Sequence, residues 1–182
     1  MAAPDYVAPI VGWRGWLVVS VEEGLRLCSP LYPTIWPPRR ATLATCRARE
    51  GWAPAAPAEH PAPEESCRCG IYASESPATA ASFISGPSLS GREPRDQQPV
   101  LGRVSLWGRV VECERGWRAA RAYPALLYVP ALLGGAHTAG PPPERPLLPA
   151  EVITRALDAY GVPVELIACE TLRQAAEMLA DR

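Results

Sequence analysis

The sequence predicts an α+β fold with a small, coiled β-barrel or sheet core, a loop pinned by zinc, and a helix–strand–helix C-terminal tail. Three observations support this prediction. Residues 100–124 alternate between two sets of side chains, as half-buried strands do. Residues 46–69 hold three cysteines and a histidine at close spacing. Residues 149–180 show two short helical patterns separated by an apolar run.

We expect residues 1–130 to form the β-rich core, residues 131–148 a linker rich in Pro and Gly, and residues 149–182 an appendage on that core. A length of 182 residues suits one medium domain. No apolar run reaches the length of a membrane span, and the N-terminal residues lack the pattern of a signal peptide. These features favour a soluble, cytoplasmic protein without a membrane partner.

The composition limits what the charged residues can indicate. All 18 basic residues are arginine, because the sequence contains no lysine. Abundant Ala, Pro and Gly alongside this bias are typical of a GC-rich bacterial genome, so arginine is a weak functional signal here. The formal net charge of −1 gives no general electrostatic reason to expect nucleic acid as a partner.

Two strand regions and one helix are expected before the tail. Residues 15–27 indicate one or two strands with a turn near Glu22-Glu23-Gly24. Ser76 and Pro77 mark the start of a short helix, since Ser caps helix N-termini and Pro suits the first turn. Residues 100–124 predict a hairpin that turns at Glu114-Arg115-Gly116. Gly102 and Gly108 within its first strand indicate sharp coiling or close backbone approach.

The tail is predicted from helix start and stop signals. Pro149 can begin a helix that runs to Tyr160 and ends at Gly161, and Thr171 to Ala180 predicts a final helix. Residues 162–168 between them indicate a short strand. The side chains of the first helix expected to face the core are Val152, Ile153, Ala156 and Leu157.

The stretch CRCGIYA, residues 67–73, is the strongest chemical signal. With the upstream cysteine and histidine it gives C-x13-H-x6-C-x-C, formed by Cys46, His60, Cys67 and Cys69. Four such ligands within a Pro-rich segment predict a tetrahedral zinc site, and Gly70 suits a backbone that turns around a metal. Four ligands also favour a closed, structural site over a catalytic one with an open position.

Other readings of these residues stay open at this stage. Cys67 and Cys69 can be small buried hydrophobic residues or a redox pair, and His60 a surface residue. Cys28 is the next candidate ligand if His60 is not one; Cys28, Cys113 and Cys169 otherwise read as core residues. Glu64 and Glu65 lie beside Cys67 and are the candidate bases if the zinc were catalytic.

The two boxes CRCGIYA and GRVSLWGRVVECERGWRAARAYP together resemble a family of uncharacterised bacterial proteins. Members pair a C-x-C-G-[IF]-Y-A box with a later G-x-V-x-L-W-G-x-V strand and a G-x-R-A return. The resemblance covers roughly residues 13–128. It implies an architecture and no particular reaction.

A second candidate site lies on the hairpin. Strand alternation places Arg103, Trp107 and Arg109 on one face, opposite a face of core residues that includes Val104, Leu106 and Val110. An indole between two guanidinium groups can stack on a base or bind an anionic ligand. The alternative is that Trp107 only packs and the arginines extend to solvent or pair with acids.

We therefore expect a non-enzymatic, zinc-stabilised binding or adaptor module. The sequence does not identify its ligand or partner; a protein and a nucleic acid are the candidate partners. A zinc-dependent hydrolase or deaminase-like enzyme is the first alternative. A structural subunit that docks by its C-terminal helices is the second. No Walker loop, G-x-G-x-x-G, G-x-S-x-G or H-E-x-x-H motif is present.

Overall fold

The computed structural model describes residues 8–31, 34–46, 60–85, 98–132 and 148–182. Within them the chain forms the strands β1 (Ile10–Val21), β2 (Gly24–Cys28), β3 (Thr42–Leu43), β4 (Ile71–Ser74), β5 (Gln98–Cys113), β6 (Gly116–Leu132) and β7 (Val164–Cys169). The helices are α1 (Pro77–Ser85), α2 (Ala150–Leu157) and α3 (Leu172–Leu179), and a short 3-10 helix, η3 (Asp158–Tyr160), follows α2. The fold is therefore α+β, as predicted. Most of the expected linker, residues 131–148, lies outside the described residues.

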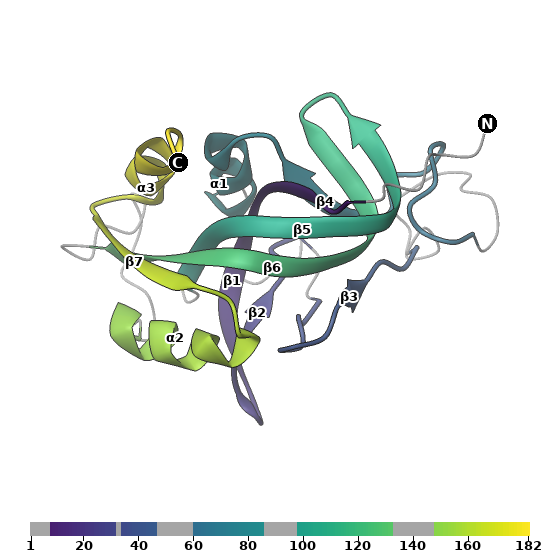
Figure 1. Cartoon of the computed structure of the whole chain (residues 1–182). Coiled ribbons are helices and arrows are strands. Elements are labelled where there is room, and N and C mark those ends of the chain that lie inside the picture. Colours follow the sequence, from purple (N-terminus) through teal and green to yellow (C-terminus); the bar gives the residue numbers. More distant parts are fainter. Residues whose placement is uncertain (1–7, 32–33, 47–59, 86–97, 133–147) are drawn as a thin grey trace.

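Seven strands form one sheet, and the long hairpin β5–β6 is its centre (Figure 1). The hairpin turns at Glu114-Arg115, as the sequence predicts. β1 pairs with β5, β5 with β6, and β6 with β4. A single pairing, Trp13 with Ser74, joins β4 back to β1. The sheet therefore closes into a ring through this one pair, and it is not a barrel.

The hairpin bends at two register shifts, one at Arg103/Val104 and one between Trp107 and Val110. Gly102 lies where a Cβ atom would come within 2.2 Å of the Leu126 carbonyl oxygen, and Gly108 has a φ of +76° at the second shift. Gly102 thus allows the backbones of β5 and β6 to approach closely, and Gly108 allows the strand to coil sharply, as their positions predict. Val104, Leu106 and Val110 are buried on the inner face, as expected.

Helices cover both sides of the sheet (Figure 1). α1 and α3 pack on one side, where buried residues including Trp13, Leu101 and Tyr128 form one apolar cluster. α2 and η3 pack on the other, where Ile153, Leu157 and Tyr160 join a second cluster with Trp16 and Trp36. The capping side chain of Ser76 accepts a hydrogen bond from the Thr79 amide at 3.2 Å, which confirms the predicted start of α1.

The tail is built into the same sheet. β7 lies parallel to β6 and pairs with its residues 127–132. Gly161 ends η3 in the left-handed conformation, as expected, and Thr171 caps α3. In α2, Val152 is 44% exposed, whereas Ile153 and Leu157 are buried. The expected inward position of Val152 is thus wrong, because Ile153, Leu157 and Tyr160 form the buried stripe and Val152 falls beside it.

Arg14 reinforces the point where the ring closes. Its guanidinium lies 5.0 Å from the Trp36 ring centroid and 6.0 Å from that of Trp16. It donates hydrogen bonds to the Tyr72 carbonyl on β4 and to Ser29 Oγ. Burial lowers the pKa of Arg14 to about 10, although the nearby Cys28 acts in the opposite direction. The side chain therefore ties β1 to β4 where the backbone contributes only one pairing.

Among the described residues, no helix combines the length and the apolar composition that crossing a bilayer requires.

Candidate metal centre

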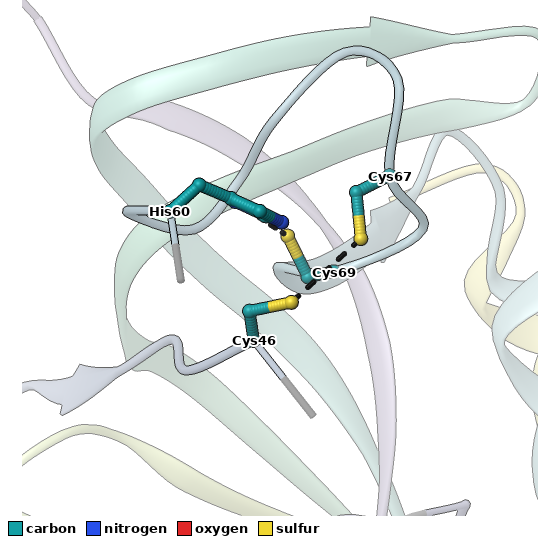
Figure 2. A group of neighbouring side chains, drawn as sticks. All are labelled: Cys46, His60, Cys67 and Cys69. Carbon is teal, nitrogen blue, oxygen red and sulfur yellow. Dashed lines mark hydrogen bonds between the residues drawn. The ribbon is translucent and has the colours of Figure 1, made fainter. Parts of the chain in front are cut away.

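Cys46, His60, Cys67 and Cys69 converge on one point (Figure 2). One ligand atom from each lies within 4.8 Å of those from the other three. All six cysteines of the chain are free thiols, so no disulfide accounts for this cluster. The four residues that the sequence pattern selects are thus brought together, and they could hold a metal ion.

The convergence follows from how β3 and β4 pair with β6. β5 occupies one edge of β6, so β3 and β4 must share the other edge. Leu43 at the end of β3 pairs with Arg121, and Ile71 at the start of β4 pairs with Ala119. The Ala44 amide donates to the Ala120 carbonyl at 2.8 Å. The chain therefore leaves the edge of β6 at the end of β3 and rejoins that edge nearby at the start of β4. Cys46, just after β3, thus lies next to Cys67 and Cys69, just before β4.

The separations suit a tetrahedral ion. Two sulfur atoms bound to zinc at about 2.3 Å in a tetrahedron lie about 3.8 Å apart. The Sγ atoms of Cys46 and Cys67 are 3.8 Å apart. The separation of these two sulfur atoms is therefore that of two ligands on one tetrahedral zinc ion. The Sγ atom of Cys69 lies 4.0 Å from His60 Nδ1.

His60 presents a nitrogen that suits metal binding. Its Nδ1 lies 3.2 Å from the Pro61 carbonyl oxygen, the usual position for a donated hydrogen bond. Its Nε2 is buried, and the described residues form no hydrogen bond with it. A tautomer with the proton on Nδ1 leaves the Nε2 lone pair free for a metal.

The two cysteines of the C-x-C pair have different acidities. For Cys67, burial opposes ionisation, but the Cys69 amide, His60 and Cys46 together lower the pKa of the thiol to about 7. For Cys69, burial and the adjacent Cys67 raise the pKa to about 11. The pKa of His60 is raised, chiefly by its hydrogen bond to Pro61. The cluster thus offers a metal a thiolate at Cys67 near neutral pH, and binding would displace a proton from Cys69.

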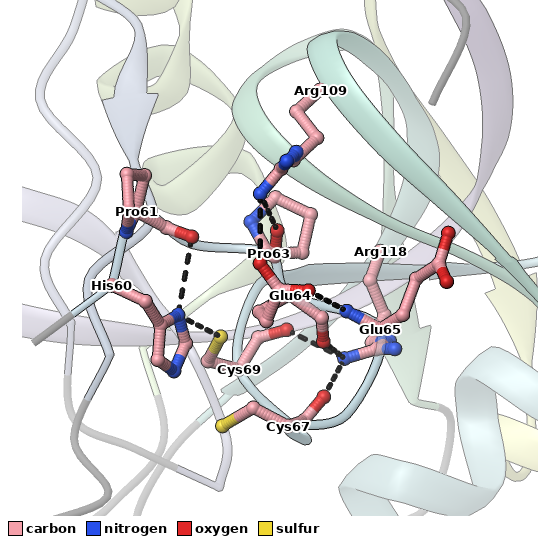
Figure 3. A network of polar contacts seen from close by, with 9 residues as sticks. All are labelled: His60, Pro61, Pro63, Glu64, Glu65, Cys67, Cys69, Arg109 and Arg118. Atoms are coloured by element: carbon pink, nitrogen blue, oxygen red, sulfur yellow. Dashed lines mark hydrogen bonds and ion pairs between the residues drawn. The ribbon is translucent and has the colours of Figure 1, made fainter. Parts of the chain in front are cut away.

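Arg118, on β6, is a residue that the sequence analysis missed (Figure 3). Its side chain is 7% exposed, and Nη1 donates to three carbonyls of the metal loop, defined here as residues 60–70. The acceptors are Cys69 O at 3.0 Å, Glu64 O at 3.3 Å and Cys67 O. Nε donates to Cys113 Sγ at 3.3 Å. A signal did exist: Arg118 is the arginine of the G-x-R-A return, and the structure pairs it with Tyr72 of the CRCGIYA box.

The two acidic residues considered as bases do not point a free carboxylate at the cluster. Glu64 Oε2 forms an ion pair with Arg109 at 3.0 Å, and Oε1 accepts the Glu65 amide at 3.1 Å. Glu65 itself is exposed. In Figure 3 the Glu64 carboxylate lies toward Arg109.

The second candidate face is arranged differently from the expected Arg–Trp–Arg stack. Trp107 is half-buried, and neither guanidinium stacks on it. Arg103 lies 4.2 Å from the Trp13 ring centroid and donates to the Arg182 carbonyl at 2.9 Å. Arg109 is bound to Glu64. The cross-strand neighbour of Trp107 is Arg121, which is exposed. Ligand binding by this face stays a prediction.

The other cysteines lie apart from the cluster. Cys28 and Cys169 are buried, and Cys113 contacts Arg118. His60, and not Cys28, thus completes the four-residue group among the described residues.

Comparisons of the chain with protein-family models, with curated proteins and with solved structures found no match.

Proposed function

We propose that Cys46, His60, Cys67 and Cys69 bind one zinc ion that stabilises the fold, and that the protein is a non-enzymatic binding or adaptor module. The observation that carries the proposal is the approach of four ligand atoms to within 4.8 Å of one another. Three thiolates and an imidazole favour zinc among the common divalent ions, because oxygen-preferring ions avoid sulfur. Four protein ligands fill a tetrahedral zinc and leave no position for water or substrate.

The position of the site supports a structural role. The ion would join Cys46, which follows β3, to the C-x-C pair that precedes β4, and so close the intervening loop at its base. Closing a loop of this length removes conformational freedom mainly from the unfolded chain. The engagement of both Glu64 carboxylate oxygens argues against the hydrolase alternative, which needs a free base near the metal.

The zinc proposal predicts both a stoichiometry and a stability effect. Protein purified without added metal should carry close to one zinc per chain by elemental analysis, and Cys69→Ser should carry much less. Chelation should lower the melting temperature of the wild type, because binding free energy contributes to folding. Cys113→Ser is the matched control, since its hydroxyl can still accept from Arg118 and it lies outside the cluster. An unchanged melting curve after complete zinc removal would reject the structural role.

We further propose that the face around Trp107 is the binding surface of the module. A half-buried indole beside the exposed Arg121 supports this, since the two offer stacking and charge together. Trp107→Ala should weaken binding to a panel of nucleotides and single-stranded nucleic acids at least tenfold, and Val152→Ala, an exposed apolar change on α2, should not. Equal binding by wild type and Trp107→Ala across the panel would remove the nucleic-acid version and leave a protein partner.

A further inference from the structure

The side chain of Arg118 binds the backbone of the metal loop on the side opposite the Sγ atoms of Cys67 and Cys69 (Figure 3). One terminal nitrogen of its guanidinium reaches the carbonyls of Glu64, Cys67 and Cys69, and Nε reaches Cys113 Sγ. Burying a guanidinium is unfavourable unless its donors are satisfied, and here backbone carbonyls of a single loop satisfy them. The side chain therefore fixes the backbone of that loop and not merely its own position.

The direction of these bonds determines where the sulfur atoms point. In Figure 3 the carbonyl oxygens of Cys67 and Cys69 face Arg118, and both Sγ atoms lie on the opposite side, toward His60. Other contacts hold the same loop: the Cys67 amide donates to the Glu64 carbonyl at 3.0 Å, and the Tyr72 hydroxyl donates to the Arg68 carbonyl at 2.7 Å. None of these contacts requires a metal.

Charge adds to the geometric effect. A zinc ion with three thiolates and a neutral imidazole carries one net negative charge. The Arg118 guanidinium is the cation bonded directly to the backbone that carries two of those thiolates. Placing it there stabilises the loaded site relative to the same site without it.

We infer that Arg118 is a positioning residue for the metal, which preforms the C-x-C half of the site and raises its affinity. The inference rests on the proposed zinc site and adds to it a claim about how that site is built. Replacing a residue that orients metal ligands through hydrogen bonds typically weakens metal binding about ten- to a hundredfold.

The test compares zinc affinity in three variants, measured by competition with a chromogenic chelator. Arg118→Gln removes both the charge and the multiple donation, and Arg118→Lys keeps the charge but cannot reach several carbonyls at once. Arg155→Gln is the control, because Arg155 lies on α2, is exposed, and forms no side-chain ion pair or hydrogen bond with the described residues. The melting temperature of each zinc-free protein separates metal affinity from general stability.

We expect Arg118→Gln to bind zinc about ten- to a hundredfold more weakly than the wild type, Arg118→Lys to recover only part of the loss, and Arg155→Gln to match the wild type. If Arg118→Gln does not fold, the affinity of Arg118→Lys decides. Wild-type affinity in Arg118→Lys, or an equal loss in Arg155→Gln, would overturn the positioning role while leaving the zinc site intact. A wild-type chain that binds no zinc would instead reject the site itself.

Discussion

At the scale of single residues, Gly70 shows why a glycine follows the C-x-C pair. Its φ is +122°, a conformation that other residues rarely adopt. A Cβ atom there would lie 3.0 Å from the Cβ atoms of both Arg118 and Pro63. The glycine therefore lets the metal loop turn tightly over Arg118 and pass into β4.

Replacing this glycine should damage both the fold and the metal site. Gly70→Ala adds backbone strain and pushes on Arg118, so we expect a loss of about 1–3 kcal/mol in the free energy of unfolding, together with weaker zinc binding. Denaturant unfolding with and without chelator measures both effects. Ser66→Ala, an exposed change in the same loop, should alter neither. A Gly70→Ala protein as stable as Ser66→Ala would show that the conformation is not required.

The sequence predicts the cluster and Gly70 but not Arg118, and the reason is physical. Ligand identity and glycine conformation are local properties that a short stretch carries by itself. The contacts of Arg118 with the metal loop join residues 49 to 54 positions apart, so they arise only when β4 pairs with β6. All 18 basic residues are arginine, so residue type alone cannot distinguish a buried arginine that binds a loop from an arginine exposed to solvent.

At the scale of elements, β6 organises the molecule because it pairs with β3, β4, β5 and β7. The hairpin that contains β6 can be predicted, because the alternation of apolar and polar side chains and the turn residues are features of consecutive residues. The ring closure through Trp13 and Ser74 cannot be predicted, since it depends on the bends at the two register shifts. Of the predicted alternatives, a coiled barrel or a coiled sheet, the structure has the sheet, which closes into a ring through one pair.

One side chain anchors η3 to the strands across the core. Tyr160 is 1% exposed, and its hydroxyl accepts the Leu27 amide at 2.9 Å and donates to the Trp36 carbonyl at 2.6 Å. Burial raises the pKa of Tyr160 to about 12, so the phenol stays protonated and keeps its role as donor at neutral pH.

Removing this hydroxyl should be costly because it leaves a buried amide and a buried carbonyl without a partner. We expect Tyr160→Phe to lower the free energy of unfolding by about 1–3 kcal/mol in denaturant titrations. Tyr128→Phe is the control, since Tyr128 is also buried but its hydroxyl forms no hydrogen bond with the described residues. Equal stability of the two variants would show that the Tyr160 bonds contribute little.

At the scale of the whole molecule, one sheet is covered on both sides, and a four-residue cluster that could hold a metal ion lies at its edge beside β3 and β4. The tail contributes β7 to the same sheet and buried residues to both apolar clusters. The proposed metal site and the face around Trp107 are both built on β6 and its partner strands. An ion bound to the metal loop would therefore also support the proposed binding face, because Glu64 of that loop is ion-paired with Arg109.

X-ray absorption at the zinc edge of the purified protein tests the central claim most directly, because it counts the ligands of the ion. The account predicts a shell of three sulfur atoms at about 2.3 Å and one nitrogen atom at about 2.0–2.1 Å. Cys46→Ser should replace one sulfur atom by a lighter scatterer. A wild-type shell with two or fewer sulfur atoms, or with added oxygen atoms from water, would contradict a closed site formed by Cys46, His60, Cys67 and Cys69.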